Sequence, residues 1–334
     1  MRVRSSLALI ACLAVGCERK APPPEPTATA TANATPTASP EEPSAEPVPE
    51  PERPPVATAP PPPPRKICPP DMVLVEPHPR SGGLTTAPAY CVDRYEGSVI
   101  DKPTKRPASP YYPPDFLRSA MFEKIWKKTM GGGTALEKGM PLPPLPEWEK
   151  SKSFVPMAVS IAGTVPQAYA SEVDAKHACE NAGKRLCTMN EWRSACRGEA
   201  DRDFPYGDTY EAGKCVIFGP AHPGVILWDN PSINHTDPRF NLVKFKGKPL
   251  LQRTGSTTTC ISRWGDDGIH DMNGNIDEWV DDPKGMFLGG FYARGKKDGC
   301  MSRVTAHPNL YSDYSTGIRC CRDVAEETAA PPSD

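Results

Sequence analysis

A short segment from Asp271 to Glu278 collects oxygen donors that suit a calcium ion. The two acids at its ends are hard anionic ligands. Backbone carbonyls near Gly274 and Ile276 add neutral oxygens in a tight turn, and Ca²⁺ takes such donors in flexible geometry. The competing interpretation is a turn rich in Asn and Asp whose acid caps neighbouring backbone amides. We expect these four residues to hold a structural Ca²⁺.

Ten cysteines remain once Cys12 and Cys17, near the start of the chain, are set aside. An even number of cysteines in an exported domain indicates a disulfide framework. The alternative is a zinc site. No pair of cysteines has CxxC spacing and no two histidines lie four apart, so the spacing argues against zinc. The six histidines are scattered along the chain.

Several longer motifs follow one another in a fixed order. They are Gly183–Trp192, Ala195–Gly198, Phe204–Asp208, Gly268–Trp279, Leu288–Phe291 and Gly317–Cys321. Together they resemble the formylglycine-generating enzyme, or sulfatase-modifying factor, family. The resemblance covers most of Cys68 to Arg322, apart from an insert at 98–154. It implies a disulfide-rich α+β fold with little regular secondary structure, similar to the C-type lectin fold.

The family's chemistry needs two thiols about five residues apart, shortly after a Gly-Gly-Ser segment. They hold Cu(I) as soft ligands while O₂ oxidises a substrate cysteine. In this chain the corresponding positions fall on Arg294 and Gly299, and only Cys300 is nearby. One thiolate cannot form a two-sulfur site, and arginine stays protonated. We therefore expect no copper site and assign no catalytic residue.

The resemblance, together with sequence position, also implies disulfide partners. Cys179 with Cys320 is similar to a bridge of the family, and Cys196 is expected to reach Cys300. Cys68 with Cys91 would close an opening hairpin. Two pairs are then left by elimination: Cys215 with Cys260, and Cys187 with Cys321. Bridges that close long loops stabilise a domain with few helices.

The elements that would position these residues are short. Residues 72–75 and 90–95 are predicted as two strands, with a turn rich in Gly and Pro between them. Residues 171–182 and 188–197 are predicted as helices, because each opens with a capping box and is followed by glycine. The insert at 98–154 carries many prolines and is predicted to be a long surface excursion.

The first residues indicate export. Arg2 and Arg4 precede a short apolar run to Gly16, which is typical of a secretory signal at 1–16. Small residues before Cys17 resemble the lipobox of bacterial lipoproteins, which implies a lipid anchor on Cys17 in the cell envelope, on the outer membrane. An ordinary cleaved signal with an incidental cysteine is the alternative.

A composition shift separates an anchor from a domain. Residues 17–66 hold the cysteine and a segment rich in Pro, Ala, Thr and Glu, with 17 of the 43 prolines between Pro22 and Pro64. Such a segment cannot bury enough apolar surface to fold. At ~3.1 Å per residue it could reach about 140 Å from a membrane. Residues 67–323 are predicted as the folded domain and 324–334 as a disordered tail.

The net charge of the chain limits the kinds of molecule that it is expected to bind. The formal net charge is −2 and basic residues do not cluster, which argues against nucleic acid. The membrane, through the lipid, and an unidentified protein or glycan are the expected partners. The sequence thus favours an envelope-anchored, non-catalytic binding or scaffold module. The alternative is a divergent, oxidoreductase-like enzyme of the same family with a new set of catalytic residues.

Overall fold

The computed structural model describes residues 66–81, 84–294 and 298–326. Contacts divide the chain into Met1–Pro60 and Pro61–Asp334, and the described residues belong to the second unit. The predicted signal, Cys17 and the tether up to residue 65 lie outside the described residues, as does the tail from residue 327. None of the described helices is both long and apolar enough to span a bilayer.

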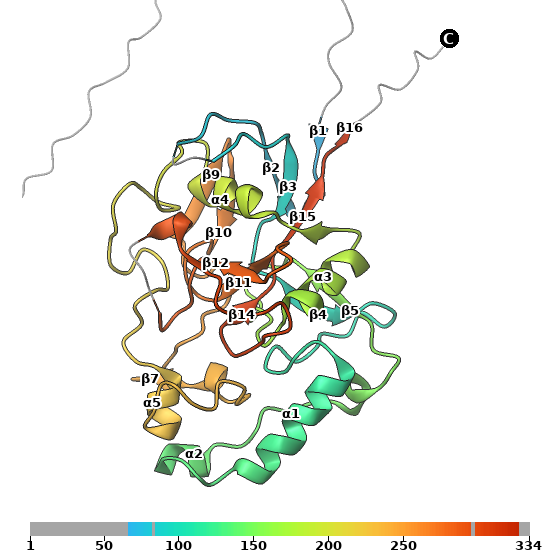
Figure 1. Cartoon of the computed structure of the whole chain (residues 1–334), viewed down its shortest axis with the longest axis vertical. Helices are drawn as coiled ribbons and strands as arrows, with labels where there is room; N and C mark the ends of the chain where they lie inside the picture. The colour runs from blue at the N-terminus through green and yellow to red at the C-terminus, as the bar shows by residue number, and fades with distance from the viewer. Residues whose placement is uncertain (1–65, 82–83, 295–297, 327–334) are drawn as a thin grey trace, which may run out of the picture. The chain divides into compact units, whose positions relative to one another are not determined.

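Two four-stranded sheets form the centre of the domain (Figure 1). The first has the order β2-β3-β15-β6 and is antiparallel throughout. Its strands are β2 Met72–Val75, β3 Tyr90–Asp93, β15 Cys320–Asp323 and β6 Arg185–Leu186. The second has the order β13-β12-β11-β14, with β11 and β14 parallel. Its strands are β13 Arg303–Val304, β12 Met286–Leu288, β11 Asp277–Val280 and β14 Thr316–Gly317.

Four two-stranded ribbons surround these sheets. They pair β9 Ile261–Trp264 with β10 Asp267–His270, β4 Ser98–Asp101 with β5 Pro156–Val159, β7 Lys244–Phe245 with β8 Lys248–Pro249, and β1 Lys66–Ile67 with β16 Ala325–Glu326. The last ribbon contains Lys66, just before the predicted start of the domain at 67, and Ala325 and Glu326, just after its predicted end at 323. The folded domain is therefore slightly longer at both ends than the sequence predicted.

The two predicted helices are confirmed at their capping boxes. Helix α3 Glu172–Asn181 begins after Ser171, whose side chain and backbone exchange hydrogen bonds with Asp174. Helix α4 Met189–Arg197 begins after Thr188 with the same arrangement. Gly198 ends α4 with a φ of 68°, a left-handed conformation that glycine adopts without strain. The strands predicted at 72–75 and 90–95 are β2 and β3.

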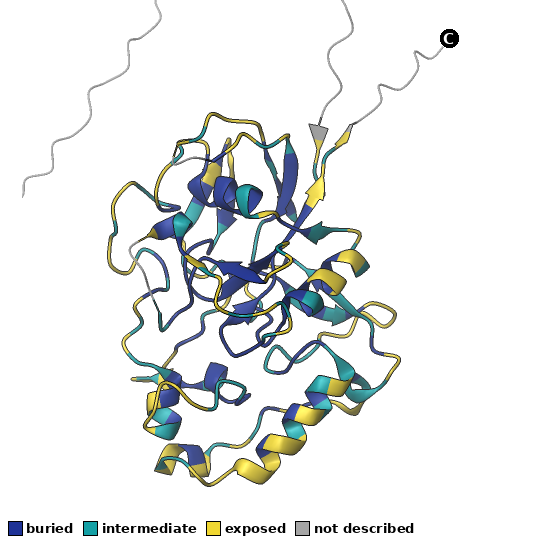
Figure 2. Ribbon diagram, in the orientation of Figure 1, coloured by how far each residue is buried: buried dark blue, intermediate teal, exposed yellow. Residues whose placement is uncertain are grey.

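The insert at 98–154 is more ordered than predicted. It contains β4, α1 Phe116–Thr129, α2 Ala135–Gly139 and the 3₁₀ turn η1 Glu147–Lys150. Phe122 and Trp126 of α1 are buried in the core, while the outer face of the helix is exposed (Figure 2). The shorter helices outside the insert are α5 Pro223–Trp228, η2 Phe240–Leu242 and η3 Gly299–Met301. The insert is therefore an integrated part of the domain and not a loop.

Five disulfides hold these short elements together. They join Cys68 to Cys91, Cys179 to Cys320, Cys187 to Cys321, Cys196 to Cys300 and Cys215 to Cys260. These are the five pairs expected from the sequence. Two bridges end on β15: Cys179 of α3 binds Cys320, and Cys187, just before α4, binds Cys321. A third joins Cys196 of α4 to Cys300 of η3. Together they link α3 and α4 to the carboxyl-terminal part of the domain.

Candidate functional site

A double-glycine turn carries the chain out of the second sheet. Gly289 and Gly290 follow β12 with φ angles of 94° and 82°. A Cβ on Gly289 would lie 3.1 Å from the carbonyl oxygen of Met272 and 3.2 Å from the ring of Trp192, so this position has little room for a side chain. The amide of Gly290 donates to Asp277 Oδ1 at 3.0 Å. The turn therefore delivers the next residues, up to Arg294, next to β11.

Arg294, the first predicted thiol position, forms a salt bridge with Asp277. Its Nη2 lies 2.7 Å from Oδ1 and 2.6 Å from Oδ2 of that carboxylate. The Asp277 side chain is 1% exposed and the Arg294 side chain 33%. Burial raises the pKa of Asp277 to about 7, and the guanidinium acts against this shift. The guanidinium also lies 5.0 Å from the centre of the Phe291 ring.

Gly299, the second predicted thiol position, has no room for a side chain. Its φ is 52°, and a Cβ built there would overlap the carbonyl oxygen of Asp203. The neighbouring Cys300 is fully buried and bonded to Cys196. All ten cysteines within the described residues are in disulfides. The described domain therefore offers no pair of thiolates to a soft metal ion.

A cavity of about 380 Å³ opens beside Arg294. We call it the Arg294 pocket. Its walls combine one guanidinium with three imidazoles and several aromatic rings, and they include His222, His235, Phe291, His307, Tyr311 and Tyr314. The rings of His307 and Tyr311 stack with their centres 3.8 Å apart. The pocket thus presents flat aromatic faces next to polar ring atoms.

Hydrogen bonds fix two of the imidazoles. His222 Nδ1 accepts from the amide of Gly224 at 3.1 Å, so the proton of the neutral ring is on Nε2, which lies 2.8 Å from the Tyr314 hydroxyl. Burial lowers the pKa of His222, which favours this neutral form. His235 Nε2 donates to the carbonyl of Pro231 at 2.9 Å. These rings are held in place before any ligand arrives.

An anchored carboxylate also lines the same pocket. Asp313 Oδ1 accepts from the amide of Ser315 at 2.8 Å and from its hydroxyl at 2.7 Å. Its other oxygen accepts from Tyr311 and lies 3.9 Å from His235 Nδ1. Asp313 therefore orients pocket side chains. Ser315 donates to this carboxylate rather than to a histidine, so these contacts do not form a Ser–His nucleophile pair.

Comparison with known families decides the identity of the domain. Residues 147–324, more than half of the chain, match the Sulfatase-modifying factor enzyme 1-like domain. The chain belongs to the sulfatase-modifying factor family. Its α+β architecture, with short strands, few helices and five disulfides, is the one that the sequence motifs predicted. A search of curated proteins finds no match.

Solved structures similar to this sulfatase-modifying factor domain are distant in sequence. PvdO from Pseudomonas aeruginosa is 14% identical with a TM-score of 0.37, and 78% of this chain aligns with 98% of PvdO. CarF is 12% identical with a TM-score of 0.34, over 76% of this chain and 95% of CarF. The Major Tropism Determinant I1 variant is 12% identical with a TM-score of 0.38, over 78% of this chain. This chain spans about half of that variant, 54% of its length.

Glu278, one of the two acids of the predicted calcium segment, is already paired. Arg319 Nε donates to both of its carboxylate oxygens at 3.0 and 2.8 Å, and Nη2 donates to Oε1 at 2.7 Å. Trp192 Nε1 adds a further bond of 2.6 Å to Oε2. Both charged side chains are nearly inaccessible, at 0% and 1%. A guanidinium in direct contact with this carboxylate would repel a cation.

Asp271 and the Gly274 carbonyl, two more of the predicted calcium donors, already accept hydrogen bonds. Asp271 Oδ2 accepts from the amide of Gly255 at 2.6 Å, and burial raises the pKa of Asp271 to about 6. The Gly274 carbonyl accepts from the amide of Ile276 at 2.7 Å. Among the residues that the structure describes, no group of three or more His, Cys, Asp or Glu side chains could hold a metal ion. With Glu278 held by Arg319, these donors do not fit a Ca²⁺ site.

Sequence reasoning missed the partners of Arg294. The motifs located position 294 but gave no signal for Asp277, which was taken only as part of the calcium segment. The three histidines of the pocket are up to 85 residues apart, between His222 and His307. Only the fold brings them together, and no spacing rule in one sequence reveals such a cluster.

Proposed function

We propose that this protein is an envelope lipoprotein whose sulfatase-modifying factor domain binds a ligand instead of oxidising a cysteine. The observation that carries the proposal is the state of the two thiol positions. Arg294 is bound to a buried carboxylate, and Gly299 cannot accept a Cβ. The family's copper chemistry requires soft sulfur donors, and neither position supplies one.

The Arg294 pocket is the candidate ligand site. Flat aromatic faces beside hydrogen-bonding groups suit a glycan ring or an extended peptide, because both combine apolar surface with polar edges. One third of the Arg294 side chain is exposed, so it can meet an acceptor group of the ligand. We therefore expect a protein or glycan ligand that places a carboxylate or hydroxyl oxygen against this guanidinium.

The anchoring half of the proposal rests on the sequence alone. Acylation of Cys17 would hold the protein in the membrane, and the proline-rich segment up to residue 66 would keep the domain away from the lipid. Metabolic labelling with an azide-bearing fatty acid should mark the wild-type protein. Cys17→Ser should lose the label and leave the membrane fraction. A labelled C17S protein would contradict this part.

Ligand binding can be tested with matched arginine variants. Purified residues 61–334 are screened against glycan and envelope-peptide libraries, with Arg294→Met beside Arg322→Met. Arg322 is exposed on β15, so its loss changes the charge equally but should leave binding unchanged. We expect R294M to weaken a binder at least tenfold. Equal binding by both variants would remove the Arg294 pocket from the proposal.

A further inference from the structure

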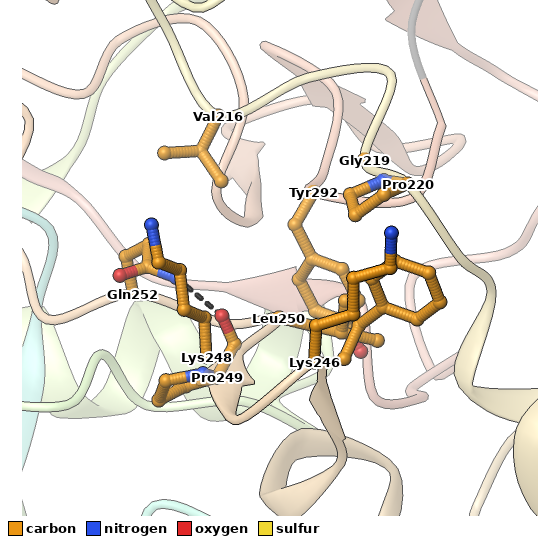
Figure 3. Close-up of a pocket in the computed structure, with 10 residues that line it drawn as sticks. Val216, Gly219, Pro220, Lys246, Lys248, Pro249, Leu250, Gln252 and Tyr292 are labelled. Carbon is orange, nitrogen blue, oxygen red and sulfur yellow. Dashed lines mark hydrogen bonds between the residues drawn. The ribbon is translucent and has the colours of Figure 1, made fainter. Parts of the chain in front are cut away.

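A second cavity is lined by a neighbour of Arg294 in the sequence, Tyr292. It measures about 450 Å³ and is lined by the β7–β8 ribbon, the loop before α5 and Tyr292 (Figure 3). Phe291 and Arg294 line the Arg294 pocket, whereas the intervening Tyr292 lines this one. We call it the lysine cavity, because Lys246 and Lys248 line it.

Most of the lining of the lysine cavity is apolar and preformed. Leu250 and Tyr292 are buried, and the Tyr292 hydroxyl is already used in a 2.9 Å bond to Asn241 Oδ1. The amide of Gly219 donates to the Tyr292 carbonyl at 2.7 Å. A Cβ on Gly219 would overlap that carbonyl, so the loop can approach this closely only as glycine. Val216, Pro220 and Phe245 complete an apolar wall.

Two ammonium groups flank this apolar space. Figure 3 shows Lys246 and Lys248 on either side of the cavity with their ammonium groups pointing the same way. Neither forms an ion pair with a described residue, and no acidic residue lines the cavity. Lys246 Nζ lies 5.5 Å from the centre of the Phe245 ring. Two like charges beside an apolar wall are complementary to an anion with an apolar body.

The ribbon holds the first lysine at a defined place. Lys246 and Gly247 form the two-residue turn between β7 and β8, with φ angles of 49° and 80°. Two successive positive φ angles are typical of a tight hairpin turn that favours Asn followed by Gly. A lysine in this left-handed conformation is unusual, and the tight turn fixes the position of its Cβ atom beside the cavity.

We propose that the lysine cavity binds a small amphiphilic acid. The apolar part of the ligand occupies the space between Leu250, Tyr292 and Val216, and its carboxylate lies between the two ammonium groups. The volume is within the range that holds small organic ligands. This site is separate from the Arg294 pocket and does not depend on the proposed function of that pocket.

Octanoate tests this proposal against two analogues of the same chain length. Titration calorimetry on residues 61–334 should show saturable binding of octanoate, at least tenfold weaker binding of octanol and none of octylammonium. Binding should also weaken with added salt, because the contact between the carboxylate and the lysines is screened. Octanol bound as tightly as octanoate, or no saturable octanoate binding, would overturn the proposal.

Variants assign the binding to this cavity. Lys246→Asn with Lys248→Gln removes both charges while placing a favoured residue in the turn, so folding should persist. It should lower octanoate affinity at least tenfold. Lys124→Gln with Lys128→Gln removes two exposed charges from α1 and should change affinity less than twofold. Val216→Phe should block binding by filling the cavity. Wild-type affinity in the K246N/K248Q protein would contradict the assignment.

Discussion

Arg294 places a fixed positive charge at the position that the sequence motifs predict for the first copper-binding thiol of the family. The charge is balanced by Asp277, which lies almost completely buried on β11. Because burial already raises the pKa of Asp277 to about 7, this carboxylate depends on the guanidinium to stay ionised near neutral pH. Arg294 is therefore paired with a buried carboxylate of the second sheet.

Arg294→Met should destabilise the domain more at pH 8 than at pH 6. Without the guanidinium the pKa of Asp277 rises further. At pH 6 the carboxyl is largely protonated in both folded proteins, so the substitution costs little. At pH 8 the wild-type carboxylate is ionised and paired with Arg294, whereas the variant must keep the carboxyl protonated or leave it charged and unpaired. We expect a loss of about 2 kcal/mol at pH 8, below the full cost of breaking a buried pair because Arg294 is partly exposed.

Urea unfolding at the two pH values measures this difference. R294M/D277N should be the control, since it has no carboxyl at position 277, so its own free energy of unfolding should gain no pH dependence from that position. An equal loss for R294M at both pH values would show that the ionisation of Asp277 does not depend on Arg294.

Two disulfides constrain almost the same loop. Cys179–Cys320 and Cys187–Cys321 close loops with sequence separations of 141 and 134, and their ends lie near each other on α3, β6 and β15. If one bridge is removed, the other still closes the long loop. Replacing both cysteines of one bridge by alanine should therefore cost only about 3 kcal/mol, the value for a short closed loop in the chain-entropy model.

Removing both bridges should cost more than the sum of the two single losses. Only then does the unfolded chain regain the freedom of the long loop, and the model gives an excess of about 2 kcal/mol. Denaturation of the two single-bridge variants and the double variant under oxidising conditions measures it. Strict additivity would mean that the two bridges act independently, through local packing.

Local signals predicted some elements well and others not at all. The capping boxes at Ser171 and Thr188 placed the starts of α3 and α4, because capping depends on residues three positions apart. Helix α1 was missed although Asp115 caps it. Its apolar residues point in two directions, with Phe122 buried and Leu117 exposed, so no single apolar stripe stands out.

Contacts between distant segments explain the other misses at the site. The predicted thiol positions and the Cys179–Cys320 bridge were transferred from the family because they lie within ordered motifs, whereas Cys187–Cys321 and Cys215–Cys260 were left by elimination. The Arg294–Asp277 pair and the histidines of the Arg294 pocket depend on how β11, β12 and the loops around α5 meet in space. Glu278 looked like a calcium ligand in the sequence because its partner, Arg319, lies 41 residues away.

The whole domain should lose stability as the pH rises toward neutrality. Glu149 is 3% exposed and accepts hydrogen bonds from the amide of Ser109. Burial raises the pKa of Glu149 to about 7. The folded state therefore keeps a proton that the unfolded chain releases above its ordinary pKa. This contribution is fully present below about pH 4.5 and is lost as the pH passes 7.

Glu149→Gln isolates that contribution. Between pH 5 and pH 8 the stability of the wild type should fall relative to E149Q by on the order of 2 kcal/mol. Glu147→Gln, in the same 3₁₀ turn but with an 89% exposed side chain, should follow the wild type. The measurement is the free energy of unfolding in urea at both pH values. A wild-type curve parallel to that of E149Q would contradict the assignment.

Copper affinity offers a check of the thiol positions that needs no substrate. The oxidised domain should not compete for Cu(I) with a weak chromophoric chelator, since its described cysteines are all in disulfides. The same titration after reduction is the control, because freed thiols should then take up the metal. Competition by the oxidised protein would reveal a soft-donor site that the described residues do not supply.

The most direct test of the account is an assay for the family's product. The purified domain is incubated with a cysteine-containing sulfatase peptide, copper and O₂, and the peptide is analysed by mass spectrometry after aldehyde trapping. With Arg294 and Gly299 at the thiol positions, we predict that the cysteine is returned unchanged. Formylglycine in the peptide would show that the domain is a working oxidase and would contradict the account.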